Sequence, residues 1–166
     1  MNNYICIGKI VNTFGIKGEL KVISDFEFQS RVFIKDFTLF IGEEKVKEVI
    51  NTWRIHKNNY LLLFNNYSNI NEVLKYKGKK IYINRNDLKL NKNEYLLNDL
   101  IGYSVYDKDK LLGIVVDYEK NINNILFKVK GDKSFYLPYI DEYILEIDNI
   151  NKKIITNNGG NLIIWK

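Results

Sequence analysis

Residues 7–22 of the chain read IGKIVNTFGIKGELKV. Apolar and polar residues alternate on both sides of a turn that contains Gly15 and Gly18, and this alternation predicts two strands that each bury one face. Glycine at these two positions allows a positive φ, or an approach of the backbone so close that a Cβ would block it. The stretch therefore predicts a β-hairpin near the start of a β-rich fold.

Three lysines, Lys9, Lys17 and Lys21, lie in or beside this hairpin. A glycine-built loop bordered by lysines can present cations and free backbone N–H groups to an anion such as a phosphate of RNA. The alternative is an ordinary hairpin with solvated lysines, because glycine turns are common and charged side chains are most often surface residues. From this stretch alone the ordinary hairpin is the favoured interpretation.

The composition supports a folded protein with a basic first half. The chain has 166 residues, of which 46% are hydrophobic, enough for one large or two small domains. Residues 1–86 carry fourteen Lys and Arg against eight Asp and Glu, whereas residues 87–166 carry eleven against twelve. The basic excess of the first half indicates an acidic partner there, most commonly nucleic acid.

Cys6 and His56 are the single cysteine and the single histidine of the sequence. They exclude an intramolecular disulfide and a zinc site built from Cys and His. Cys6 lies in an apolar run and is expected to be a small buried residue rather than a nucleophile. His56 lies at a turn, where a solvated side chain is a better interpretation than a catalytic base.

The remaining chemistry-bearing residues do not form a recognisable catalytic set. The acidic pairs Glu43/Glu44 and Asp141/Glu142 are sequence neighbours, so their side chains do not converge on one substrate. No nucleotide-binding glycine motif is present. We therefore expect no catalytic residue, no metal and no cofactor. No apolar run reaches the roughly eighteen residues of a membrane span, and the start of the chain lacks the features of a signal peptide. We expect a soluble cytoplasmic protein, the alternative being an organellar protein whose transit peptide was removed.

Turn signals at short intervals, between runs rich in β-branched and aromatic residues, predict a strand for almost every segment. The expected strands are residues 4–11, 19–25, 37–41, 45–55, 60–64 and 79–83 in the first half, then 100–106, 111–118, 125–130, 134–138, 144–147 and 153–156. Residues 68–75 predict a short helix, capped by Ser68 or Asn69, that closes one end of a barrel. The polar segment 87–93 is expected to link domains at 1–86 and 94–166.

Tyr95, Tyr139 and Tyr143 are expected at strand edges, beside the linker and beside Pro138. Exposed tyrosines at such places can anchor a protein partner. Packing between the two domains explains them equally well.

Seven segments spread over nearly the whole chain carry a further signal; they are residues 8–22, 71–83, 94–102, 112–115, 123–126, 135–140 and 147–148. In this order they resemble the RimM family of ribosome maturation factors. The resemblance implies an all-β fold of two small β-barrels. The first is a six-stranded barrel of the translation-factor kind, and the second is a PRC barrel.

The resemblance also implies a function. RimM proteins are non-enzymatic assembly factors that bind the free small ribosomal subunit through ribosomal protein S-nineteen and head rRNA, and promote head maturation and 16S rRNA processing. On this basis we expect a monomer with two binding surfaces. The residues expected to contact the ribosomal protein are Tyr95, Leu97, Asn98, Asp99, Pro138 and Tyr139. Those expected to face rRNA are Lys9, Gly15, Lys17, Gly18 and Lys21.

The chain departs from the family pattern at two places. The family has two adjacent aromatic residues followed by Trp where this chain has Tyr95-Leu96-Leu97, so only Tyr95 carries over. The family's C-terminal Gly-Leu-Leu corresponds to residues 159–162, which leaves the register of the last strand open. The alternative functions are a general RNA-binding β-barrel without ribosomal specificity and an unrecognised hydrolase or transferase.

Overall fold

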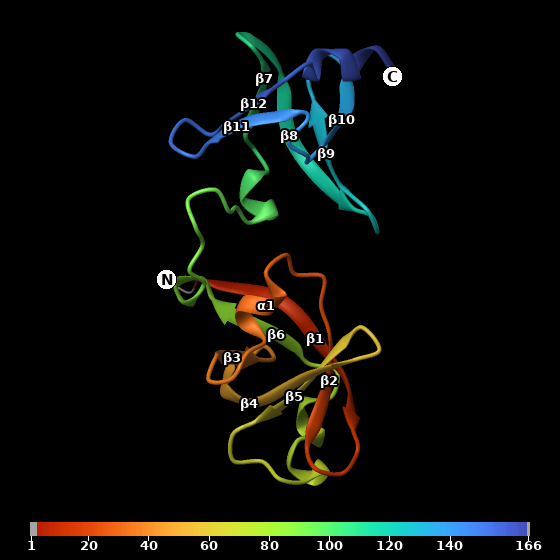
Figure 1. Ribbon diagram of the computed structural model, residues 1–166. Helices are drawn as coiled ribbons and strands as arrows, with labels where there is room; N and C mark the ends of the chain where they lie inside the picture. Colours follow the sequence, from red (N-terminus) through yellow and green to blue (C-terminus); the bar gives the residue numbers. More distant parts are fainter. Residues whose placement is uncertain (1–2, 166) are drawn as a thin grey trace. The chain divides into compact units, whose positions relative to one another are not determined.

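The computed structural model describes residues 3–165 and divides into two compact units, the first ending at Asn91 and the second beginning at Lys92. Figure 1 shows the strands of each unit. We expect no signal peptide at the start of the chain, where Met1 and Asn2 lie outside the described residues. Each unit is described by itself below.

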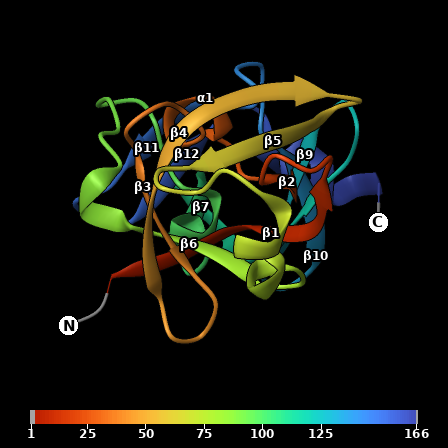
Figure 2. The same ribbon diagram turned by 90° about the horizontal axis from the view of Figure 1, so that it is seen from below.

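The first unit is a closed six-stranded barrel with the order β1-β2-β5-β4-β3-β6. The strands are β1 (Tyr4–Phe14), β2 (Glu19–Ile23), β3 (Thr38–Ile41), β4 (Val46–His56), β5 (Asn59–Phe64) and β6 (Lys80–Asn84). β1 pairs antiparallel with both β2 and β6, which closes the barrel. Figure 2 shows β1 and β6 side by side, with β4 and β5 as a long hairpin. The interior is filled by fully buried side chains such as Ile10, Leu20, Leu39 and Ile50.

Two irregularities in β1 change which side chains face the core. The pairing register of β1 shifts between Cys6 and Gly8 against β6, and between Ile10 and Asn12 against β2. A bulge of this kind re-aims the neighbouring side chains. Ile7 is therefore buried and Cys6 is exposed, so the expectation of a buried cysteine is wrong.

The segment expected to form one short helix forms two 3₁₀ turns, η1 (Ile70–Glu72) and η2 (Leu74–Tyr76). Asn69 caps the first, as its side chain accepts a hydrogen bond from the Glu72 N–H while the Glu72 carboxylate accepts one from the Asn69 N–H. Tyr76 is buried and its ring lies 5.9 Å from that of Phe64. The segment thus packs against the barrel as expected, with tighter helical geometry.

Besides η5 (Gly159–Trp165) at the end of the chain, three further short helical elements were not predicted. They are α1 (Gln29–Val32), which buries Val32, and the 3₁₀ turns η3 (Arg85–Asp87) and η4 (Leu97–Leu100). η4 ends at Leu100, the first residue of the strand expected at 100–106, and the strand begins only at Ser104. Gly102, with φ +95°, lies between the two elements. A positive φ cannot continue a strand, so the chain turns there.

The second unit is a six-stranded sheet with the order β10-β9-β8-β7-β12-β11. The strands are β7 (Ser104–Asp107), β8 (Lys110–Lys120), β9 (Ile125–Lys130), β10 (Ser134–Pro138), β11 (Ile144–Asp148) and β12 (Lys153–Thr156). A flat sheet of this size would hold its outer strands about 24 Å apart. Residues 139–143 join these outer strands while making a hydrogen-bonded turn, so the sheet must curl. The predicted all-β fold of two barrel-like units is confirmed.

The end of the chain forms a 3₁₀ segment, η5 (Gly159–Trp165), so residues 159–162 do not belong to a strand. The Gly160 N–H donates a 2.9 Å hydrogen bond to the Asp107 carboxylate. The core of the second unit includes the fully buried Phe127, Phe135 and Ile154.

Candidate functional site

In the turn between β1 and β2, two neighbouring side chains are exposed to solvent while the glycine that follows them is buried. Ile16 is 76% exposed and Lys17 is exposed, whereas Gly18 is buried at φ +103°. A Cβ on Gly18 would lie 3.3 Å from Leu63 Cδ1 and 3.4 Å from the Asn69 carbonyl oxygen. Gly18 therefore lets the turn pack closely against Leu63 and Asn69, and Lys17 is the charged side chain that the turn exposes to solvent.

The structure does not bring the five residues expected to face rRNA into one cluster. Lys17 lies at the tip of the turn, and Lys21 lies on β2 opposite Asn12. Lys9 precedes Gly15 by six residues, which is about 20 Å along an extended strand. Lys9 instead lies opposite Lys80 of β6. The sequence did not single out Lys80, because only barrel closure makes the two lysines neighbours.

An ion pair borders the turn on the β4 side. Arg54 donates from Nε to Glu19 Oε2 and from Nη2 to Glu19 Oε1, both at 2.9 Å. These hydrogen bonds hold the pKa of Glu19 below its ordinary value, with smaller help from the charges of Arg54 and Lys17. Because Arg54 already neutralises Glu19, the lysines of this hairpin are available to an external anion.

His56 is half-buried, and its ring lies 4.9 Å from that of Phe14. The Arg54 guanidinium also lies over the Phe14 ring, 5.4 Å from its centroid. The rings of His56 and Phe14 are tilted by 57°, so His56 makes a ring contact that joins the end of β4 to the end of β1. It is less solvated than the sequence predicts.

The residues expected to contact a ribosomal protein divide into buried and accessible groups. Leu97 is 1% exposed and belongs to the core of the second unit, so a direct contact through its side chain is excluded. Asn98 is exposed on the same 3₁₀ turn, and Asp99 is half-buried. The sequence indicated no helical turn at residues 97–100, so it could not show that η4 turns Leu97 inward.

Tyr95 and Tyr139 are half-buried and both pack against the core of the second unit. The Tyr95 hydroxyl donates to the Ile147 carbonyl oxygen over 3.4 Å. The Tyr139 ring lies 5.2 Å from Phe127, and its N–H donates to the Ile125 carbonyl oxygen at 2.9 Å. Pro138, also half-buried, ends β10 immediately before it. Each tyrosine thus offers a rigid, partly exposed ring, which is the kind of group that anchors protein interfaces.

Tyr103 is a further member of this region that the sequence did not indicate. Its hydroxyl donates to Asn149 Oδ1 at 3.0 Å. Burial raises its pKa, and the neighbouring charges of Asp99, Tyr95 and Asp148 add to the effect. Tyr103 therefore stays neutral and ties η4 to the β11–β12 turn.

Within residues 3–165, no group of three or more His, Cys, Asp or Glu side chains is placed to hold a metal ion. The same part of the chain contains no helix that is both long and apolar enough to cross a membrane.

Two family matches cover both units of the chain. Residues 5–88 match the family described as the RimM N-terminal domain, and residues 97–158 match the RimM PRC barrel domain. The chain belongs to the RimM family. The resemblance that the sequence motifs indicate is therefore confirmed, and the two matched segments correspond to the barrel and to the curled sheet.

Relatives of known name match most of the chain. The ribosome maturation factor RimM of Staphylococcus haemolyticus is 38% identical over 153 residues, which cover 89% of this chain and 92% of the relative. The RimM of Staphylococcus aureus strain NCTC 8325 is 36% identical over 154 residues, or 90% and 92% of the two chains. A solved Pseudomonas aeruginosa structure, described as a 16S ribosomal RNA processing protein RimM, is 23% identical with a TM-score of 0.48 and covers 95% of this chain and 99% of that one.

Proposed function

We propose that this RimM-family protein is a non-enzymatic ribosome assembly factor of the cytoplasm. It binds the free small ribosomal subunit through ribosomal protein S-nineteen and head rRNA, and it promotes head maturation and 16S rRNA processing. The observation that carries the proposal is the match to staphylococcal ribosome maturation factors along about nine-tenths of both chains. A match of this coverage includes both units of the chain.

The charge of the first unit supports an rRNA contact there. Lys17 and Lys21 border the β1–β2 turn, and Glu19 beside them is already paired with Arg54. Surface cations of this kind give fast, salt-sensitive association with RNA phosphates. In this proposal Lys9, Lys17 and Lys21 face rRNA, while Gly15 and Gly18 shape the backbone between them.

The second unit supports the contact with the ribosomal protein. Tyr95 and Tyr139 supply ordered rings, and Asn98, Asp99 and Pro138 surround them in the proposal. A small apolar patch with polar neighbours is the usual anatomy of a protein interface. Leu97 supports this surface indirectly, because its side chain packs in the core and holds η4 in place.

Co-sedimentation with free small subunits and with assembled ribosomes tests the proposal as a whole. We expect the protein to pellet with the free subunit and to stay in solution with the assembled ribosome. Replacing Lys17 and Lys21 together by Glu weakens subunit binding, most strongly at low salt. The control replaces Lys110 and Lys133, two exposed lysines of the second unit, by Glu and leaves binding unchanged. Unaltered binding of the first double variant at low salt would refute the rRNA contact.

Binding to purified ribosomal protein S-nineteen tests the second surface. Asn98→Arg places a bulky charge on an exposed position without touching the core, so we expect lost binding at unchanged melting temperature. Tyr139→Ala is expected to lose binding as well, although its contact with Phe127 makes a melting curve necessary. If both variants bind as the unmodified chain does, the protein contact lies elsewhere.

The basic first half also fits a general RNA-binding barrel without ribosomal specificity. That function predicts similar affinity for arbitrary RNA and for small subunits, together with a steep dependence on salt. Equal pelleting with free subunits and assembled ribosomes would favour it.

A further inference from the structure

One outer face of the first barrel combines aromatic rings with lysines. Phe40 of β3 lies opposite both Tyr82 of β6 and Lys47 of β4, while Lys9 of β1 lies opposite Lys80 of β6. Tyr4 of β1 adds a ring 5.0 Å from that of Phe40. We call the set the aromatic–lysine face; its members are Tyr4, Lys9, Phe40, Lys45, Lys47, Lys80 and Tyr82.

The rings of this face are half-buried, so they lie along the barrel with part of their surface open. Lys45 Nζ lies 4.1 Å from the ring centroid of Tyr82 and 5.6 Å from that of Tyr4. A lysine over a ring is a weak contact at an exposed site, and its flexible stem lets the ammonium move. A flat ligand can therefore take the place of Lys45 over Tyr82, while the ammonium turns to a nearby anion.

The lysines of this face are arranged for an anion. Lys9 and Lys80 are directly opposite on paired strands, an arrangement that like charges make unfavourable until an anion lies between them. Glu48, the acid on this part of β4, accepts hydrogen bonds from the Tyr67 and Tyr76 hydroxyls and is engaged there. Glu43 and Glu44 lie in the β3–β4 turn and line a second recess together with Lys80 and Tyr82, so two acidic residues border the face.

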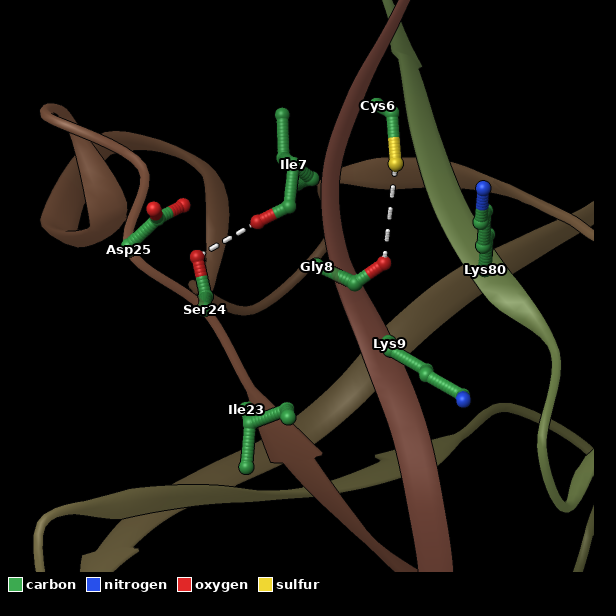
Figure 3. A pocket seen from close by; sticks show the side chains of 8 residues that line it. All are labelled: Cys6, Ile7, Gly8, Lys9, Ile23, Ser24, Asp25 and Lys80. Atoms are coloured by element: carbon green, nitrogen blue, oxygen red, sulfur yellow. Dashed lines mark hydrogen bonds between the residues drawn. The ribbon is translucent and has the colours of Figure 1, made fainter.

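A largely apolar recess of about 470 Å³ adjoins the two lysines. It forms where β1 bulges, and its lining is Cys6, Ile7, Gly8, Lys9, Ile23, Ser24, Asp25 and Lys80, so one carboxylate, that of Asp25, shares it with the two lysines. Figure 3 shows Lys9 and Lys80 on the same side of β1. A recess of this volume is large enough for a small flat ligand.

We propose that the aromatic–lysine face binds a single-stranded segment of RNA, a refinement that rests on the rRNA contact proposed above. Bases stack on Tyr82, Tyr4 and Phe40, and the phosphates contact Lys9, Lys80, Lys45 and Lys47. Proteins recognise single strands through this combination, because unpaired bases expose their faces to aromatic side chains. A duplex keeps its bases stacked inside and would meet only the lysines.

Fluorescence anisotropy with the full chain tests the preference. The probes are a labelled twelve-nucleotide uridine RNA and an RNA duplex of the same length. We expect the single strand to bind more tightly. Tyr82→Leu keeps an apolar side chain and loses the stacking ring, so it weakens single-strand binding about tenfold and leaves duplex binding unchanged. Replacing Lys9 and Lys80 together by Gln lowers the slope of log K against log salt by about 1.4.

Matched controls keep the test specific. Lys57→Gln and Lys133→Gln each remove an exposed lysine that is not a member of the aromatic–lysine face, and we expect neither to change the slope. Melting curves identify any variant that is not folded, and Tyr82→Phe, which keeps the ring, is expected to bind normally. Binding by Tyr82→Leu equal to that of the unmodified chain overturns the proposal. Equal affinity for the single strand and the duplex also overturns it. A poly-glutamate peptide that displaces the labelled RNA at a lower concentration than unlabelled RNA does would overturn it as well.

Co-sedimentation separates this inference from the proposed function. A chain that fails to pellet with small subunits but keeps its single-strand preference refutes the ribosomal function and supports this face. Subunit binding with no single-strand preference refutes the face alone.

Discussion

Alanine at three glycines of the first barrel separates backbone strain from steric contact. Gly15 has φ +70°, and a Cβ there meets nothing within 4 Å. Gly8 has no positive φ, but its Cβ would lie 2.7 Å from the Ile23 carbonyl oxygen. Gly18 combines φ +103° with contacts of 3.3 Å to Leu63 and 3.4 Å to Asn69.

The expected costs follow from these differences. Gly15→Ala adds only left-handed strain, about 1 kcal/mol. Gly8→Ala forces β1 away from the end of β2, an overpacking cost of about 1–3 kcal/mol. Gly18→Ala carries both penalties, so we expect about 2–4 kcal/mol. The order of stability is therefore unmodified chain, Gly15→Ala, Gly8→Ala, Gly18→Ala.

Urea unfolding followed by tryptophan fluorescence measures these free energies. The sequence has two tryptophans, so the series is made with Trp165→Phe and reports Trp53 of β4. Gly15→Asn is the control, because asparagine tolerates a left-handed backbone better than alanine. Equal losses for Gly15→Ala and Gly18→Ala would refute the contact argument at Gly18, and a neutral Gly8→Ala would refute the close approach of β1 and β2.

Three other predictions concern single interactions. Asn69→Ala removes the side-chain half of the η1 cap and lowers the free energy of unfolding by about 1 kcal/mol, measured by urea titration. Arg54→Met removes the group that lowers the pKa of Glu19. A lowered carboxyl pKa contributes its full stability above the ordinary carboxyl value of about 4.3, and that contribution is lost as the pH falls through the lowered pKa of the folded chain. The variant is therefore less stable than the unmodified chain at pH 7, and melting curves at decreasing pH should show the difference shrinking below about pH 4. Burial, together with the hydrogen bond to Glu48, raises the pKa of Tyr76. The stability that neutral Tyr76 contributes is therefore fully present below about pH 10 and falls as the pH rises further. Tyr76→Phe lacks the ionising hydroxyl, so its free energy of unfolding should fall less steeply in urea titrations at alkaline pH.

Alternation of apolar and polar residues was enough to predict the strands. All six strands of the first barrel occur within a few residues of their expected positions, because each buries one face against a common core. Cys6 was misplaced for a reason that alternation cannot express. The bulge between Cys6 and Gly8 depends on how β1 pairs with β6, which lies more than seventy residues away along the chain.

The segment 68–75 shows the limit of helix signals. The cap was predicted correctly at Asn69, and Gly78 does follow with φ +84°. Between them the chain is too short for a stable α-helix, and 3₁₀ geometry, common in such short pieces, is found instead. Capping residues therefore located the element, while its helical type depended on packing of Val73 and Tyr76 against the barrel.

Candidate site residues were harder to predict, since spacing along one strand does not show which residues face each other across the barrel. Lys9, Lys17 and Lys21 are close in sequence, yet Lys9 finds its neighbour in Lys80. Closure of the barrel by β1 and β6 thus gathers cations from both ends of the first unit. The basic excess of the first half could be counted from the sequence, but the position of Lys9 opposite Lys80 required the pairing of β1 with β6.

The leucines at positions 96 and 97 show how burial changes the meaning of a departure from the family pattern. Leu96 is 5% exposed and Leu97 is 1% exposed, so both side chains fill the interior around η4. Replacing family aromatics by leucine there changes the packing of the core, and leaves the accessible groups Tyr95 and Asn98 in place. We therefore expect Leu97→Ala to cost about 2–5 kcal/mol of unfolding free energy. Binding of the folded fraction to S-nineteen should be retained, whereas Asn98→Arg should lose binding at full stability. The opposite pattern, with binding lost by a folded Leu97→Ala chain and kept by Asn98→Arg, would place the contact on a different side of η4.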